Sequence, residues 1–92
     1  MLRVEWRQKA AEDLLALVEY IARDNPDAAQ ALADEICQKA AQASQHPTLY
    51  KAGRVRGTRE IVVRPNYLLV YRLEGSTLAV LRVLHARQKW PA

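Results

Sequence analysis

Residues 57–90 read GTREIVVRPNYLLVYRLEGSTLAVLRVLHARQKW. Runs rich in Val, Leu, Ile and Tyr are interrupted by turn residues at Pro65-Asn66 and at Gly75-Ser76. This spacing predicts three consecutive antiparallel strands joined by two tight turns. Both faces of such a sheet are largely apolar, and a chain of 92 residues has room for one modest core. We therefore expect part of the sheet to need a partner.

The turns allow the two faces of the predicted sheet to be written down. If both are two-residue hairpin loops, opposed residues share a face. One face then carries Val62, Arg64, Tyr67, Leu69, Tyr71, Leu73, Leu78, Val80, Arg82 and Leu84. The other carries Arg59, Ile61, Val63, Leu68, Val70, Arg72, Ala79, Leu81, Val83 and His85, with Arg87 beyond. Alternation alone does not decide which face packs on the helices. The other is expected to be covered by a partner chain or a homodimer, or alternatively by residues 47–57 and the C-terminal tail.

The first half of the chain predicts one strand and two helices. Residues 2–6 alternate and indicate a short strand. A first helical stripe follows at Ala11, Leu14, Leu15, Val18, Ile21 and Ala22, with Glu12, Asp13, Glu19 and Arg23 turned to water. Asn25-Pro26-Asp27 is typical of a helix start. A second stripe then runs through Ala29, Leu32, Ala33, Ile36, Ala40 and Ala43. The predicted order is β-α-α-β-β-β: an α+β single domain over residues 1–92, with a helical hairpin packed on a small, mostly antiparallel sheet.

Composition and charge narrow the class of protein. Half of the residues are hydrophobic and 26% are charged, as in soluble globular proteins. The single Cys37 and the lack of a long apolar run favour a cytoplasmic protein with no membrane association. Residues 1–46 carry 5 Lys/Arg against 8 Asp/Glu, and residues 47–92 carry 9 against 2. The cationic second half is expected to attract nucleic acid or an acidic protein, unless it is only a solubilising surface.

No metal site or cofactor is expected, because the two histidines are far apart in sequence and the three glycines form no phosphate-binding loop. What remains is a set of cations around one imidazole: Arg59, Arg72, His85 and Arg87, with Lys51, Arg54 and Arg56 in the basic segment 47–57. His85 could act as acid or base in RNA cleavage, with arginines holding phosphate. The alternative is a structural histidine at a strand end beside a solvated loop.

The motifs PNYLLVYR (65–72) and VLRVLHARQ (80–88), together with the predicted element order, resemble the RelE/ParE toxin superfamily, and most closely its plasmid-stabilisation branch. The pattern VEW…A..DL..L..YIA..NP.AA in the first half agrees. The resemblance implies the toxin of a type II toxin–antitoxin module, with an antitoxin encoded alongside that wraps the toxin and mediates binding to operator DNA. It also implies that Tyr67, Leu69, Tyr71 and Leu84 face the helices. The antitoxin would then lie over Leu68, Val70, Leu81 and Val83.

The resemblance leaves the target open. Ribosome-dependent endoribonucleases of the superfamily usually carry an arginine where this chain has Leu68, and often a tyrosine near the C-terminus, which is absent beyond Tyr71. ParE-like inhibition of DNA gyrase, which needs no catalytic set, is therefore favoured slightly. In the alternative, an mRNA interferase acting at the ribosomal A site, His85 and Arg87 would be catalytic. The expected target-binding cations are Lys51, Arg54, Arg56, Arg59, Arg64, Arg72 and Arg82. A basic structural or nucleic-acid-binding domain without toxicity is the third possibility.

Overall fold

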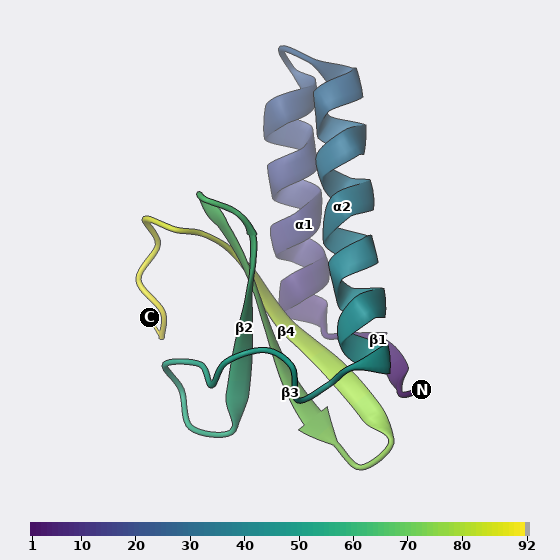
Figure 1. Cartoon of the computed structure of the whole chain (residues 1–92). Coiled ribbons are helices and arrows are strands. Elements are labelled where there is room, and N and C mark those ends of the chain that lie inside the picture. Colours follow the sequence, from purple (N-terminus) through teal and green to yellow (C-terminus); the bar gives the residue numbers. More distant parts are fainter. Residues whose placement is uncertain (92) are drawn as a thin grey trace.

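The computed structural model describes residues 1–91, and within them two helices pack on a four-stranded sheet (Figure 1). The elements are β1 (Arg3–Trp6), α1 (Gln8–Ala22), α2 (Pro26–Gln45), β2 (Thr58–Arg64), β3 (Tyr67–Glu74) and β4 (Thr77–His85). The strand order is β1-β4-β3-β2, with β1 parallel to β4 and the other pairs antiparallel. The predicted element order and the α+β architecture are confirmed.

The helical hairpin begins and turns where the sequence indicates. The Oδ1 atom of Asn25 accepts the backbone N–H of Ala28 at 3.0 Å, Pro26 occupies the first helical position and Asp27 lies in the first turn. On α2 the predicted stripe is buried at Ala29, Leu32, Ile36, Ala40 and Ala43. Because alanines extend little from the helix axis, α2 approaches its neighbours closely along this stripe.

On α1 the buried stripe differs from the predicted one by a fraction of a turn. Ala10 is fully buried, and Leu14, Leu17 and Ile21 pack against the core. Leu15, expected in the stripe, is 61% exposed. The sequence carries apolar residues around more than half of this helix, so periodicity alone did not fix its rotation.

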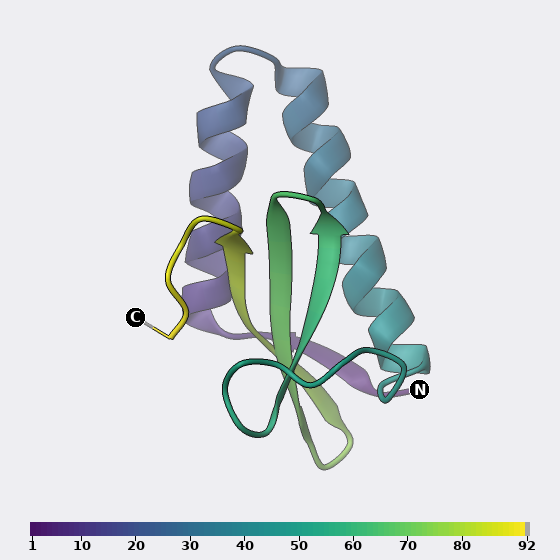
Figure 2. The ribbon, with the colours of Figure 1, turned by 60° about the vertical axis from the view of Figure 1, so that its left-hand side comes forward.

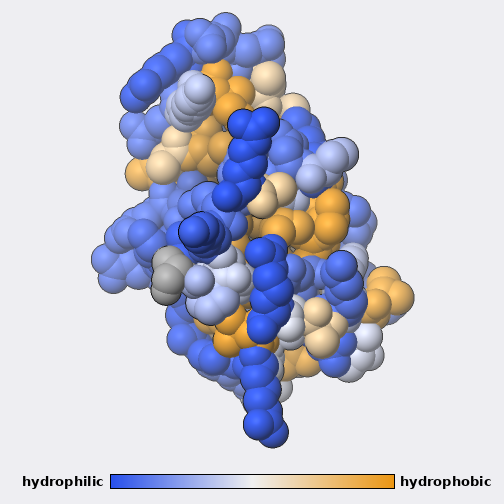
Figure 3. Space-filling model, turned by 90° about the vertical axis from the view of Figure 1, so that its left-hand side faces the viewer, coloured by the Kyte–Doolittle hydropathy of each residue, from blue (hydrophilic) through white to orange (hydrophobic). Residues whose placement is uncertain are grey.

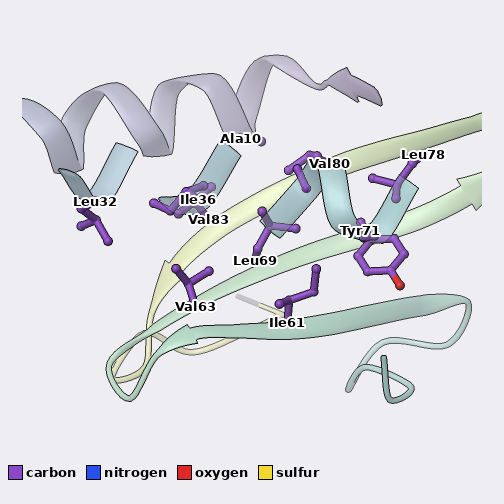
Figure 4. Packing of buried hydrophobic residues seen from close by; sticks show 12 residues of the cluster. Ala10, Leu32, Ile36, Ile61, Val63, Leu69, Tyr71, Leu78, Val80 and Val83 are labelled. Atoms are coloured by element: carbon purple, nitrogen blue, oxygen red, sulfur yellow. The ribbon is translucent and has the colours of Figure 1, made fainter. Parts of the chain in front are cut away.

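The core lies between the helical hairpin and one face of the sheet (Figure 4). The residues at its centre are Leu32 and Ile36 from α2, Ile61 from β2, Leu69 and Tyr71 from β3, and Leu78, Val80 and Val83 from β4. Tyr71 is completely buried, and its hydroxyl donates a 2.7 Å hydrogen bond to the carbonyl of Pro47. Burial raises the pKa of the Tyr71 phenol, because it disfavours the charged phenolate.

Two single-residue irregularities reverse half of the predicted face assignment. Between β2 and β3, Arg64 pairs with Tyr67, but the next pair is Val62 with Leu68. Between β3 and β4, Tyr71 pairs with Val80, but the next pair is Val70 with Arg82, so that Leu81 has no partner. A one-residue shift moves every following side chain to the opposite face.

The side chains beyond the bulges therefore differ from the prediction. Ile61, Val63 and Val83 face the helices instead of sharing a face with Leu68. Leu84, expected toward the helices, pairs with Leu68 on the opposite face, which we call the outer face. The two-residue turns themselves are as predicted. Simple alternation failed because nothing in the sequence marked the two bulges.

Candidate functional site

His85 lies at the end of β4 in a row that crosses three strands. Arg64 pairs with Tyr67 and Tyr67 pairs with His85, so the three residues lie side by side on the helix-facing side of the sheet. The rings of Tyr67 and His85 meet edge to face, with centroids 5.4 Å apart. Arg64 Nε donates to Glu35 of α2 at 2.8 Å. His85 was predicted on the open face, and the bulge at Leu81 is the reason that it is not there.

The segment after β4 fixes the orientation of the His85 ring. Its Nδ1 atom accepts the backbone N–H of Arg87 at 3.1 Å, and its own backbone N–H donates to the Gln88 side chain at 2.7 Å. In the neutral ring the proton therefore resides on Nε2, which is the atom left for an external partner. The Arg87 side chain is exposed and makes no ion pair within residues 1–91.

The predicted cationic cluster is not assembled around His85. Arg72 lies near the opposite end of β3, where its Nε contacts Glu74 at 3.0 Å. Arg59 pairs with Tyr71 in the sheet, and its Nη1 donates to the carbonyl of Tyr50 at 2.6 Å. Arg72 therefore lies on the opposite face from His85, whereas Arg59 is on the same face as His85 but opposite Tyr71, four positions along β3 from Tyr67. The predicted grouping of Arg59, Arg72, His85 and Arg87 around one imidazole is not assembled.

Four of the seven cations expected to bind a target form ion pairs with acidic side chains. The pairs are Arg54 with Glu60, Arg64 with Glu35, Arg72 with Glu74, and Arg82 with Asp13. Of the seven cations expected to bind a target, Lys51 and Arg56 are exposed and form no ion pair within residues 1–91. Four of the nine cations in residues 47–92 are thus compensated by acids. The exposed, unpaired members of the set expected to bind a target, Lys51 and Arg56, both lie in the basic loop 47–57.

The basic loop is folded around Glu60, whose side chain is 7% exposed. The Glu60 carboxylate accepts the backbone N–H of Arg54 at 2.9 Å, and the backbone N–H of Glu60 donates to the carbonyl of Lys51 at 3.2 Å. A Cβ atom at Gly53 would overlap with the Thr58 hydroxyl, so the loop closes too tightly for a side chain there. Glu60 is not among the residues predicted from the sequence. Its signal was that it is one of two acids among residues 47–92.

A second cluster, also not predicted from the sequence, joins α1, β4 and the C-terminal tail. Asp13 accepts Arg82 Nε at 2.7 Å, Arg82 Nη2 at 3.2 Å and the backbone N–H of Val83 at 3.0 Å. The two side chains are 11% and 16% exposed. The Arg82 guanidinium also lies 5.5 Å from the centre of the Trp90 ring. Asp13 thus binds the edge of β4 beyond the part that pairs with β1. The prediction that Asp13 faces solvent is therefore wrong, because its side chain is largely buried against β4.

The outer face of the sheet is covered in part by the chain itself. Val70 and Ala79 are fully buried and Leu84 is 1% exposed, although all three lie outside the main core cluster. Figure 2 shows loop 47–57 crossing in front of the lower part of the sheet, with the C-terminal segment beside β4. Viewed from this side, the surface is mainly hydrophilic with separate apolar patches (Figure 3). Of the two expectations for the outer face, coverage by loop 47–57 and the C-terminal tail therefore describes the structure better than a fully exposed apolar strip.

The four residues predicted to bind an antitoxin do not form one exposed strip. Val83 lies in the core with Ile36 (Figure 4). Val70 is fully buried, but outside this core cluster. Leu68 and Leu81 remain partly exposed. Val62, which was not among the four, is 52% exposed beside Leu68, its neighbour across the sheet.

A largely apolar hollow, which we call the helix hollow, lies instead on the helices. Its volume is about 410 Å³, and it is lined by Trp6, Ala11, Leu14, Leu15, Val18, Ala33 and Cys37. Four of these residues belong to the α1 stripe that the sequence assigned to the core, two come from α2, and Trp6 comes from β1. The surplus of apolar residues on α1 was the signal that a second apolar surface exists.

Residues 1–91 contain neither a metal-binding cluster nor a membrane-spanning helix. There, no three His, Cys, Asp or Glu side chains come together in a way that could hold a metal ion. Neither helix in this part of the chain combines the length and apolar composition needed to cross a membrane. The features of this part of the chain that could bind a partner are therefore its exposed cations, the row of Arg64, Tyr67 and His85, and its apolar patches.

Comparison with known proteins identifies the family. The family described as "ParE toxin of type II toxin-antitoxin system, parDE" matches residues 4–90. Toxin RelE2 of Caulobacter vibrioides is 32% identical over 88 residues, covering 94% of this chain and 97% of RelE2. The protein Y4kP of Sinorhizobium fredii is 32% identical over 90 residues, covering 97% and 93% of the two chains.

A solved structure of the chromosomal ParDE toxin–antitoxin system from P. aeruginosa has the same fold, with a TM-score of 0.81 at 22% identity, over 95% of this chain and 98% of that one. The chain belongs to the ParE toxin family of type II toxin–antitoxin systems. Its resemblance to the wider RelE/ParE superfamily is thereby confirmed.

Proposed function

We propose that this chain arrests bacterial growth by binding DNA gyrase, and that a cognate antitoxin encoded alongside it holds it inactive and links it to operator DNA. The family match supports the toxin–antitoxin part of the proposal. The partner is supported by the similarity to the ParDE system and to the toxin–antitoxin complex RelBE2 from Mycobacterium tuberculosis, which has a TM-score of 0.64 at 27% identity over 91% of this chain and 96% of that one.

The observation that favours gyrase binding over RNA cleavage is that two sheet arginines that could hold phosphate near His85 are already paired with acids. Arg64 is paired with Glu35, and Arg82 is paired with Asp13. Leu68 lies beside Leu84 on the outer face, at the position where nucleases of the superfamily usually have an arginine. Losing one preorganised cation that stabilises a transition state costs on the order of 10²–10³ in rate. A protein that acts by binding does not need this set.

Ribosome-dependent cleavage of mRNA is the second candidate, and the row of Arg64, Tyr67 and His85 favours it. The Nε2 atom of His85 is the ring nitrogen left for an external partner, and Arg87 is exposed close by. In this reading His85 would exchange a proton with the RNA and Arg87 would hold the phosphate. The 32% identity to Toxin RelE2 makes the alternative worth testing.

Parallel assays on one preparation separate the two. Protein freed of antitoxin, and shown to be folded, is added to a gyrase supercoiling assay and to ribosomes paused on a defined mRNA. Inhibition of supercoiling without a cut in the A-site codon is the expected result. A cut that disappears in His85→Ala and Arg87→Ala would establish the nuclease instead. If gyrase is the target, those two variants should still arrest growth, whereas deletion of residues 88–92 should weaken the arrest more.

A further inference from the structure

Strand β2 forms one edge of the sheet, and the chain covers half of that edge itself. Residues 51–53 run antiparallel to the start of β2: Gly53 N–H donates to the Thr58 carbonyl at 2.8 Å, and Glu60 N–H donates to the Lys51 carbonyl at 3.2 Å. Before Lys51 the loop leaves the edge, and Figure 2 shows it crossing the lower part of the sheet. The second half of β2 is therefore left uncovered.

The backbone of Val62 continues this row of hydrogen-bonding groups. Thr58 and Glu60 direct backbone groups away from β3, and alternation along an antiparallel strand gives Val62 the same direction. Within residues 1–91, neither the N–H nor the C=O of Val62 has a backbone partner outside the sheet. An edge with unpaired groups is a template for another strand. The short stretch 51–53 thus begins a fifth strand that the chain does not complete.

A cleft of about 380 Å³ lies at the point where this row stops. Val62 and Leu68 form its apolar wall, and residues 51–54 and Glu60 form the other side. Val62 is 52% exposed, which is unusual for a valine in the middle of a strand. A strand added here would place alternate side chains in this cleft, because side chains of a strand alternate between its two faces.

The charges around the cleft indicate the composition of the added strand. Lys51 lines it, Arg56 lies in the same loop, and both are exposed without an acidic partner within residues 1–91. An acidic segment would complement them, whereas a second copy of this chain would bring identical cations to the same place. A nucleic acid has no backbone N–H and C=O groups to continue the row. The structure therefore favours a peptide over both.

We propose that the uncovered half of β2 binds an extended, acidic segment of a partner protein by strand addition. The segment pairs with the backbone of Val62, places one apolar side chain against Val62 and Leu68, and directs carboxylates toward Lys51 and Arg56. The inference rests on the proposed function in one respect: the antitoxin encoded alongside is the protein that carries the segment. It names the mode and the chemistry of that contact, and it does not depend on the toxin's target.

The test uses the complex of this chain with the antitoxin encoded alongside it. Amide hydrogen exchange is measured on the chain alone and in the complex, and we expect exchange at Val62 to slow by at least about tenfold. Val62→Pro removes the outward N–H while leaving the inner ladder to β3 intact, as prolines at sheet edges do. We expect Val62→Pro to raise the Kd for the antitoxin by about tenfold or more, and Val62→Thr, its matched control, by less than about twofold.

The charge contribution has its own pair of variants. Lys51→Glu combined with Arg56→Glu should weaken binding and flatten its salt dependence, whereas Lys9→Glu, an exposed lysine on α1, should change neither. Circular dichroism and thermal unfolding establish that each variant folds. If Val62→Pro does not fold, hydrogen exchange on the unmodified chain decides the question.

The outcomes separate this inference from the proposed function. A complex that forms without protection of the Val62 amide, or that binds Val62→Pro as tightly as the unmodified chain, overturns the strand addition alone. Protection of Val62 in a protein that does not arrest growth supports the strand addition and overturns the toxic function. A folded chain that binds no antitoxin overturns both the partner and the strand addition.

Discussion

The contact between Asp13 and Arg82 gives the sharpest test of how this fold is held together. Asp13 accepts two hydrogen bonds from Arg82 and one from the backbone of Val83, and both charged side chains are more than four-fifths buried. Removing one partner of a buried ion pair leaves the other charge uncompensated and costs about 3–5 kcal/mol. A domain of 92 residues has a free energy of unfolding of about 5–14 kcal/mol. Asp13→Ala should therefore remove at least a fifth of it and could remove all.

The assay is urea unfolding followed by circular dichroism on four proteins. They are the unmodified chain, Asp13→Ala, Arg82→Met and the double variant. The double variant should be more stable than the sum of the single effects implies, by about 1–3 kcal/mol, because no unpaired charge remains buried. Asp34→Ala is the matched control: it removes an exposed aspartate on α2 that accepts one hydrogen bond from Gln30, and it should cost less than about 1 kcal/mol.

Two results would refute the reasoning. One is a cost for Asp13→Ala no larger than that for Asp34→Ala, which would mean that water compensates the Arg82 charge. The other is strict additivity in the double variant. A further check is Asp13→Asn, which keeps an acceptor for the Val83 N–H and should cost less than Asp13→Ala.

Three further predictions concern the core and the loop. Tyr71→Phe should cost about 1 kcal/mol for the lost hydrogen bond. Because burial raises the pKa of Tyr71, the folded state favours the neutral phenol, and stability should fall as the pH rises above the ordinary tyrosine value of about 10. Urea midpoints at pH 8 and pH 11 should show a smaller fall in the variant, and an identical fall would contradict the assignment. Gly53→Ala should lower stability by about 1–3 kcal/mol, because its methyl group overlaps with Thr58, and an unchanged melting temperature would mean that the loop gives way. Val83→Asp should unfold the protein, whereas Leu81→Asp should cost less than about 2 kcal/mol. Equal costs in chemical denaturation would contradict the register shift at Leu81.

The secondary structure followed from local signals that act over a few residues. Asn25-Pro26-Asp27 marked the start of α2, and Pro65-Asn66 and Gly75-Ser76 marked the two turns of the sheet. The motifs at residues 65–72 and 80–88 carried the family resemblance. Each of these features is determined by neighbouring residues, because capping, turn geometry and side-chain periodicity depend on the local backbone.

The site was less accessible because it depends on register and on contacts between distant segments. The bulge at Val63 decides which face holds Ile61, and the bulge at Leu81 decides which face holds Val83 and His85. A bulge leaves no distinct signature in a run of β-branched and apolar residues. Asp13 contacts Arg82 although the two are 69 positions apart in the sequence, so the local sequence around either residue does not predict the other as its partner.

By itself, then, the sequence determined the element order, the family and the excess of positive charge in the second half of the chain. Tertiary structure alone decided which cations remain free, since Asp13, Glu35, Glu60 and Glu74 each compensate an arginine. It also decided which apolar residues remain exposed, because loop 47–57 and the C-terminal tail cover part of the outer face, whereas Val62 and the helix hollow stay accessible. The physical reason is that burial and ion pairing are set by distances between side chains in three dimensions, and the linear pattern constrains these only through the register of the sheet.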